Sequence, residues 1–593
     1  MKLKRIITFV LSLVMVLALL AGCGSSDKKD SGSNNSSVSI DEGDFSKADI
    51  IYAGENNAAV YKMIKASDLA DEVIDKSSEL YKALKNAFNL DGFRNVVDKT
   101  VEYSADAKEI LIGATDRPES LQALEYLRSL NNGRKGDYII CTIGNKVVIH
   151  GLTSEAQVAG IQYYIDNYAS ANVTGGILHT YLTEGEFKDV TINSAHLSRF
   201  KVIRPRFNFG YIAQIQIDKM IDEVESVNGY AMDYYYDRTT EAAEYEIIVG
   251  DCKRDGVTQI TDRDKYEIRV VGKKVYLNGG SASAIAMAVS EFAKLLSKGS
   301  LSDADTVNGS YAAAVASYDK KTYYTRTWGD DFDSTTKTTA NSDLWFTVPK
   351  EQFGNKGHNG RDSIRTTDTN YVYIQDGKFH IDCGYNNTQY IGGMIMTDRT
   401  MYYKYGYIEL SAIIPDGKGL WTALWLDSRW SPIPEPEAGL LYDLEIDINE
   451  CYGNAKQFDA TAHKHPTDLG LANNLVHEAI PWDNDRRHEC PEGRFSDEYH
   501  TYGLLWDDDE FTFTCDGEAF YTWANNTTAE DLDAYHQLAY VRLSAAVGFH
   551  DAPSGGIISD DDPAWKNSNR FIVDYVHIYQ IQDGKQRLEV LKS

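Results

Sequence analysis

The sequence has no pair of cysteines spaced to hold a metal ion. It contains 7 cysteines in 593 residues, and no two of them form a CxxC motif. We therefore predict no zinc site. Apart from Cys23, the cysteine spacings match no disulfide framework, so we expect mostly buried free thiols at positions 141, 252, 383, 451, 490 and 515.

Positive charge is also scarce. The 59 lysines and arginines are outnumbered by 88 aspartates and glutamates, which gives a formal net charge of -29. This balance argues against a nucleic-acid partner, because the chain would repel phosphate. The glycine-rich stretch "NGGSASA" (278–284) lacks the lysine of a Walker motif and is no dinucleotide fingerprint, so we interpret it as a strand-to-helix turn.

The apolar run near the start, Ile6–Leu20, is too short for a membrane-spanning helix. Basic residues precede it and "LAGC" closes it at Cys23, which predicts a secretory signal over residues 1–23. That ending resembles a bacterial lipobox, which implies lipid attachment to Cys23; an uncleaved anchor helix is the alternative. Residues 24–48 offer almost nothing to bury, so we expect a flexible linker in a lipid-anchored, extracytoplasmic protein.

Two stretches in the first half, beginning near residues 109 and 245, repeat one pattern. Each has a short apolar strand ending in glycine, then two strands joined by a two-residue turn, then a helix. We predict two related α+β units, at residues 49–195 and 196–300. The predicted turns are Gly144-Asn145 and Gly272-Lys273.

The residue pattern of the sequence changes after residue 300. Residues 301–320 are small and polar, which predicts a linker. From there to residue 582, short alternating strands are separated by turn residues, and helical periodicity nearly disappears. This half is therefore expected to be an all-β sandwich or a related fold, with hairpin turns at Asp376-Gly377 and Asp516-Gly517.

One strand of this half, "EIDINE" (445–450), carries three carboxylates. Glu445 and Asp447 point to the same face because side chains alternate along a strand, but Glu450 is out of phase. A single-residue β-bulge between Asp447 and Glu450 would bring all three acids to one surface. Three adjacent acids are too costly to keep for packing alone.

Such a line of acids suits hydrolysis of a glycosidic bond. One carboxylate must be ionised at the anomeric centre and another must be protonated to assist the leaving oxygen. A calcium site and a solvated acidic strand are the non-enzymatic alternatives. Upstream, Trp421 and Trp425 lie four residues apart on one strand and hence on one face, where they could form platforms for sugar rings or pack in the core.

Five segments, in order, resemble glycoside hydrolase family 16. They are "TWGDDFDS" (327–334), "YGYIEL" with "PDGKGLWTALWL" (405–426), "EIDINE" (445–450), "YHTYGLLWDDDEFTFTCDG" (499–517) and "FIVDYVHIYQ" (571–580). The resemblance covers residues 321–582 and implies a concanavalin A-like jelly roll with a cleft on its concave face. The sequence departs from the family at Ser411 and Leu444, where a basic residue and a glycine are usual.

The resemblance implies that Glu445 is the nucleophile, Glu450 the general acid/base and Asp447 the assisting carboxylate of a retaining mechanism. It also implies that Trp421, Trp425, Trp430 and His463 bind substrate. No cofactor is required, although a structural calcium ion at Asp574 is implied. The two α+β units resemble accessory domains found in many bacterial glycoside hydrolases.

We therefore expect a lipid-anchored, monomeric, endo-acting hydrolase of β-1,3- or mixed β-1,3/1,4-glucans. The alternatives are a galactan hydrolase of the agar or carrageenan type, and a glycan-binding surface lipoprotein whose hydrolase domain is weak or inactive. An adhesive or wall-organising protein that acts through its N-terminal units is a further alternative.

Overall fold

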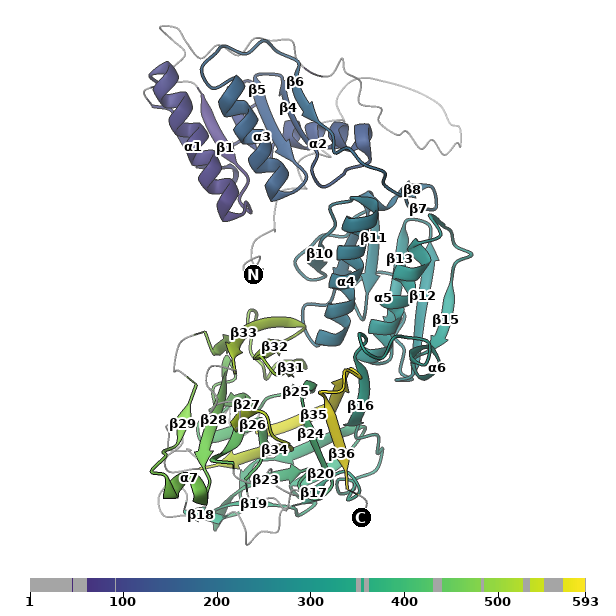
Figure 1. Cartoon of the computed structure of the whole chain (residues 1–593), viewed down its shortest axis with the longest axis vertical. Helices are drawn as coiled ribbons and strands as arrows, with labels where there is room; N and C mark the ends of the chain where they lie inside the picture. The colour runs from purple at the N-terminus through teal and green to yellow at the C-terminus, as the bar shows by residue number, and fades with distance from the viewer. Residues whose placement is uncertain are drawn as a thin grey trace, which may run out of the picture.

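The computed structural model describes residues 45, 61–90, 92–347, 354–356, 362–429, 440–480, 485–525, 534–548 and 569–591. Two α/β units precede a large β-sandwich, and the second unit lies between the first unit and the sandwich (Figure 1). None of the described helices combines the length and apolarity needed to cross a membrane. The predicted signal, Cys23 and the linker at 24–48 lie outside the described residues.

The first unit is a three-layer α/β/α structure. Its sheet has the strand order β2-β1-β3-β5-β4-β6. Helices α1 (Asp71–Phe88) and α3 (Ser154–Asn167) pack on one face and α2 (Pro118–Asn131) on the other. The strands are β1 (Lys62–Lys65), β2 (Arg94–Val97), β3 (Glu109–Ile112), β4 (Tyr138–Ile143), β5 (Lys146–Gly151) and β6 (Ile177–Tyr181).

The second unit repeats this topology with the order β10-β9-β11-β13-β12-β15. Helices α4 (Tyr211–Asn228) and α5 (Ala282–Leu296) pack together on one face of the sheet. The strands are β9 (Lys201–Arg204), β10 (Tyr234–Tyr236), β11 (Glu246–Val249), β12 (Lys265–Val271), β13 (Lys274–Gly279) and β15 (Val307–Ser310). A small sheet of β7 (Thr191–Ile192), β8 (Ala195–His196) and β14 (Ser300–Leu301) lies beside it.

The two units share a buried charge pattern. In each, a buried glutamate at the start of the third strand in chain order pairs with an arginine eight residues later and with a lysine on the adjacent strand. A repeat of charged residues that are costly to bury indicates that the units are related in sequence as well as topology. The residues are Glu109, Arg117 and Lys146 in the first unit, and Glu246, Arg254 and Lys274 in the second.

The linker predicted at residues 301–320 is corrected in part. Val307–Ser310 forms β15, which pairs with β12 along the edge of the second sheet, and α6 (Tyr311–Val315) follows directly. The strand is only partly buried, so its small polar residues carry little of the alternation that would reveal it. Tertiary pairing decided its conformation.

The sandwich consists of two large sheets whose inner faces form one hydrophobic core. The first sheet has the order β20-β21-β35-β25-β31-β32-β33, with β16 paired to β35. Its strands are β16 (Thr325–Asp330), β20 (Val372–Gln375), β21 (Lys378–Asp382), β25 (Gly406–Ile413), β31 (His500–Trp506), β32 (Glu510–Cys515), β33 (Glu518–Ala524) and β35 (Arg570–Gln580).

The second sheet contains the "EIDINE" segment near its middle, in the order β18-β19-β23-β34-β26-β27-β28-β29. Short strands β17 (Phe346–Thr347), β22 (Gly384–Tyr385) and β30 (Arg487–Glu489) pair alongside, helix α7 (Asp468–Ala472) follows β28, and β24 (Met401–Lys404) pairs with β36 (Arg587–Val590). The main strands are β18 (Gly354–Lys356), β19 (Asp362–Thr366), β23 (Gln389–Met396), β26 (Leu420–Asp427), β27 (Tyr442–Cys451), β28 (Gln457–Pro466), β29 (Glu478–Ala479) and β34 (Tyr540–Val547).

Several local predictions are confirmed. All four predicted hairpin turns join antiparallel strands at the expected residues. The stretch "NGGSASA" joins β13 to α5, and the side chain of Ser281 caps the helix. The six cysteines after Cys23 are free, and all but Cys490 are buried.

The second unit packs on the outer face of the first sandwich sheet. Glu409 of β25 is fully buried at this junction. Its carboxylate accepts hydrogen bonds from the backbone N–H of Tyr211, at the start of α4, and from the hydroxyls of Tyr407 and Tyr575. A buried acid with three donors from both partners ties the second unit to the sandwich.

Candidate active site

The predicted β-bulge is present in β27. Trp425 of β26 lies opposite Asp447, whereas the preceding Leu424 lies opposite Asn449, so Ile448 is the extra residue. The register against β28 shifts over the same stretch, between Asp447 and Glu450. The bulge returns Glu450 to the face that carries Glu445 and Asp447.

These three acids line one pocket on the outer face of the second sheet. Residues of β26, β19 and β34 complete it. The lining residues are Arg365, Trp421, Ala423, Trp425, Glu445, Asp447, Glu450 and Ser544. The apolar side chains that alternate with the acids, at positions 444, 446 and 448, are buried in the sandwich core on the other side of the strand.

Glu445 lies among basic side chains. The guanidinium of Arg429 donates a hydrogen bond to its Oε2, and Nε2 of His465 lies 3.4 Å from the same oxygen. Arg429 is held in turn by Asp427, whose Oδ1 lies 3.0 Å from its Nε. A neighbouring guanidinium favours the ionised form of a carboxyl group, as a nucleophile requires.

Glu450 has the opposite environment. It is 7% exposed, and burial together with the nearby Asp447 raises its pKa to about 8. The indole N–H of Trp421 donates to its Oε1 at 3.1 Å and so orients the carboxyl group. A carboxyl group with this pKa is protonated at neutral pH, as a general acid must be.

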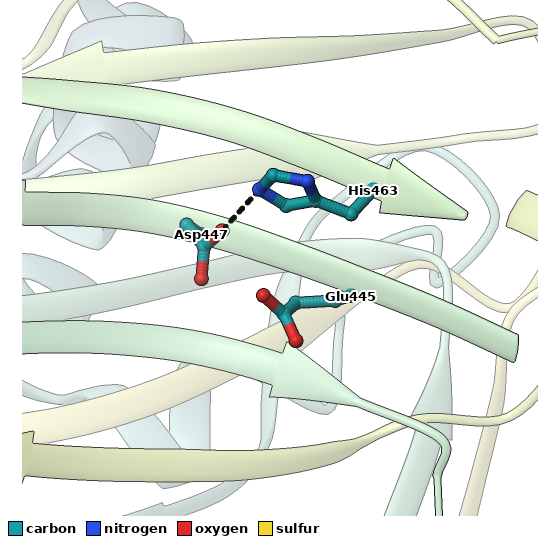
Figure 2. Close-up of side chains that lie close together, drawn as sticks. All are labelled: Glu445, Asp447 and His463. Carbon is teal, nitrogen blue, oxygen red and sulfur yellow. Dashed lines mark ion pairs between the residues drawn. The ribbon is translucent and has the colours of Figure 1, made fainter. Parts of the chain in front are cut away.

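Asp447 lies between these two acids and is 4% exposed. Burial is the main cause of its raised pKa, about 7, and Arg429 opposes that shift. Figure 2 shows Asp447 and Glu445 on β27 facing His463 on the neighbouring strand, with Nε2 of His463 3.2 Å from Oδ2 of Asp447. Burial lowers the pKa of His463, so this contact joins a neutral imidazole to Asp447.

The two predicted tryptophan platforms that the structure describes both line the pocket. Trp421 contacts Glu450, and the indole N–H of Trp425 donates to the hydroxyl of Ser544 at 3.1 Å. The guanidinium of Arg542 lies 4.4 Å from the centre of the Trp425 ring. These two contacts fix the orientation of the Trp425 ring before any ligand binds. Trp430 lies outside the described residues.

Asp574 lies on the first sheet, away from this pocket, and is paired with cations. Its Oδ1 accepts hydrogen bonds from Nζ of Lys378 at 2.6 Å and from the guanidinium of Arg263 at 2.7 Å. Arg263 comes from the second unit, so Asp574 joins that unit to the sandwich. Calcium binding at Asp574 stays a prediction, and the ion would have to compete with two cationic side chains.

Residues 359–561 match the sequence profile described as Glycosyl hydrolases family 16. This part of the chain is a glycoside hydrolase family 16 domain. The match includes the pocket, the bulged strand and all three acids, so the recognition made from the five sequence segments is confirmed.

Two relatives of the family 16 domain carry the names of glycan-cleaving enzymes. Glucan endo-1,3-beta-glucosidase A1 of Niallia circulans is 26% identical over 278 residues, which are 43% of this chain and 38% of the relative. Endo-1,3-1,4-beta-glycanase EglC of Rhizobium meliloti is 25% identical over 283 residues, 43% of this chain and 52% of the relative. The chain therefore spans about a third to a half of these relatives.

Solved structures similar to this chain include the catalytic domain of an endo-1,3-beta-glucanase (laminarinase) from Thermotoga petrophila RKU-1. It is 20% identical, with a TM-score of 0.33, and the alignment covers 44% of this chain and 98% of the other.

Sequence reasoning missed several side chains around the acids. Arg429 follows Trp425 in "WLDSRW", and nothing in that segment indicates that it reaches across to Glu445 on β27. The position of His465 could have been predicted from the sequence, because in "HKH" it lies two residues from His463 and so shares its strand face. His477 comes from the loop before β29, and only the fold brings it to His463, with His463 Nδ1 and His477 Nε2 3.0 Å apart.

Proposed function

We propose that this chain is an endo-acting, retaining hydrolase of β-1,3- or mixed β-1,3/1,4-glucans. The observation that carries the proposal is the line of three acids in one pocket, with Glu445 beside a guanidinium and Glu450 buried, so that its pKa is raised to about 8. The name of the Niallia circulans relative, a glucan endo-1,3-beta-glucosidase, supports the substrate class.

The proposed reaction uses the two outer acids in turn. Glu450 donates its proton to the glycosidic oxygen while the Glu445 carboxylate attacks the anomeric carbon, which gives a covalent glycosyl-enzyme and releases the first product. Glu450, now ionised, takes a proton from water as that water attacks the same carbon and frees Glu445. Burial is the main cause of the raised pKa of Glu450 that the first step needs, and Asp447, between the two acids, raises it further.

The substrate is tested by release of new reducing ends from laminarin, lichenan, cereal β-glucan, agarose and carrageenan. We expect activity on one or more of the three glucans, with oligosaccharides of mixed length as early products. Early release of a single short product would contradict the endo assignment. No activity on any of the five, with polysaccharide binding retained, would favour the glycan-binding surface lipoprotein instead.

A second candidate, a hydrolase of charged galactans, is favoured by the basic side of the pocket. Arg365 lines it, and burial together with the nearby Arg542 lowers the pKa of Arg365 to about 10, so this side chain still carries a positive charge at neutral pH. Such charge suits a sulfated chain better than a neutral glucan. Cleavage of carrageenan, with laminarin untouched, would select this candidate.

The pH profile should show the coupling of Asp447 and Glu450. Because Glu450 must be protonated in the free enzyme, we expect kcat/KM to fall as the pH rises through about 8. Asp447→Asn removes a charge that raises the pKa of Glu450, so its residual activity should fall at lower pH than that of the wild type. Rates of the wild type and the variant between about pH 5 and 10 locate the pH at which each loses activity. If both lost activity at the same alkaline pH, the coupling would be contradicted.

The cellular setting is part of the same proposal. Export by the signal at residues 1–23 and lipid attachment at Cys23 would place the enzyme on the outer face of the membrane. A surface-anchored hydrolase would meet polymers too large to enter the cell.

A further inference from the structure

The histidines beside the catalytic acids have no part in the proposed reaction. His463, His465 and His477 form a stacked group, with ring centres of neighbours 4.6 to 6.0 Å apart. His463 lies beside Asp447 and His465 beside Glu445 (Figure 2 shows His463 with these two acids).

Glu445, Asp447 and His463 hold three donor atoms in metal-binding geometry. One oxygen of each carboxylate and one ring nitrogen of His463 all lie within 4.8 Å of one another. Donors around a divalent ion bound at about 2.0 to 2.2 Å lie no more than about 4.4 Å apart, so at most a small movement of the side chains would let all three bind one ion. Two carboxylates and one imidazole on one side of a pocket leave further coordination positions to water.

His463 is also oriented as metal-bound histidines usually are. Its Nε2 faces Asp447 at 3.2 Å, while its Nδ1 lies 3.0 Å from Nε2 of His477. A ligating histidine needs its second ring nitrogen held by a partner, which fixes both the tautomer and the ring orientation. His477 supplies that partner, and its stacking on His463 and His465 fixes its own position.

We infer that Glu445, Asp447 and His463 form a binding site for a divalent transition-metal ion such as Zn²⁺, and that the bound ion blocks hydrolysis. The donor set selects this class, because imidazole favours zinc and its neighbours whereas calcium and magnesium take oxygen ligands. The prediction of no zinc site rested on cysteine spacing and did not consider these donors.

The bound ion would inhibit hydrolysis because it would occupy atoms that the reaction needs. A metal bound by Glu445 takes the electron pair that must attack the anomeric carbon, and its water ligands fill the place of the sugar ring. Arg429, which also contacts Glu445, opposes the ion's charge and weakens binding without removing a donor. The inhibitory half of the inference rests on the proposed function, whereas the binding half does not.

Binding is tested by calorimetric titration of Zn²⁺ into the chain from residue 24, with Mg²⁺ as the comparison ion and Co²⁺ absorption as a second readout. We expect one Zn²⁺ site that is lost in both His463→Ala and His463→Gln and weakened about 10- to 100-fold in His477→Ala. Thermal melts show whether each variant is folded. Glu450→Gln lies outside the donor set, so it should be inactive in hydrolysis yet bind Zn²⁺ like the wild type.

Two results would overturn the site: no Zn²⁺ binding by the wild type, or equal binding by the wild type and folded His463→Ala. For inhibition, Zn²⁺ should stop hydrolysis by the wild type and act on His477→Ala only at about 10- to 100-fold higher concentration. If no substrate is cleaved but Zn²⁺ binding still depends on His463, the proposed function fails and the metal site stands. Full activity with the site saturated would refute inhibition alone.

Discussion

Glu445→Gln is expected to lower hydrolysis by about 10⁶-fold, the order of loss measured when the covalent nucleophile of a serine protease is removed. The amide keeps the shape of the side chain but offers no anionic oxygen to attack the anomeric carbon. Initial rates of reducing-end release on the preferred substrate measure the loss. Glu478→Gln is the matched control, because Glu478 is an exposed glutamate on β29 outside the pocket, and it should keep wild-type rates.

Added azide separates the roles of the two outer acids. In Glu445→Ala, azide takes the place of the missing carboxylate and attacks the anomeric carbon, so the glycosyl azide has inverted configuration. In Glu450→Ala, Glu445 still forms the glycosyl-enzyme, and azide then displaces it to give retained configuration. The opposite pairing of products would exchange the two assignments, and a Glu445→Gln rate near that of the wild type would remove Glu445 from the mechanism.

Glu409→Ala is expected to destabilise the protein by about 3–5 kcal/mol, because each buried donor left without an acceptor costs about 1–3 kcal/mol. Three donors lose the carboxylate as an acceptor: the Tyr211 N–H at 2.8 Å, the Tyr575 hydroxyl at 2.8 Å and the Tyr407 hydroxyl at 2.6 Å. Of these, the Tyr407 hydroxyl keeps a second partner, the hydroxyl of Thr514 at 3.1 Å. The carboxylate also lies at the N-terminus of α4, where the helix dipole favours negative charge. Denaturant unfolding of the full chain measures the loss.

Two control variants sharpen this measurement. Glu409→Gln keeps one oxygen acceptor for some of the donors and should lose less stability. Glu510→Ala replaces an exposed glutamate on β32 of the same sheet and should change stability by no more than about 0.5 kcal/mol. Equal stability of Glu409→Ala and the wild type would show that the junction contributes nothing to folding.

The same junction changes how a truncation must be interpreted. Deleting residues 49–300 would ask whether the N-terminal units are needed for hydrolysis. In the structure, that deletion would uncover Tyr407 and Tyr579, which pack in the core of the second unit. Lost activity in the truncated chain would therefore report on folding, whereas point variants in the pocket leave the junction intact.

The sequence by itself determined the features that depend on neighbours along the chain. The alternation of "EIDINE" and its out-of-phase Glu450 required a bulge, and the structure has one at Ile448. Two-residue turns such as Asp376-Gly377 were equally local, because turn geometry is set by the residues in the turn. The five family segments located the hydrolase domain for the same reason, since each is a continuous stretch of chain.

Only the tertiary structure decided the features that depend on residues distant in the chain. Arg429, His465 and His477 reach Glu445 and His463 because β26, β27, β28 and β29 pair side by side, and no spacing in the sequence states that pairing. The raised pKa of Glu450 comes mainly from burial, which exists only once the sheets have closed. Strand β15 needed β12 as a partner, since a weakly patterned edge strand takes its conformation from the strand it pairs with.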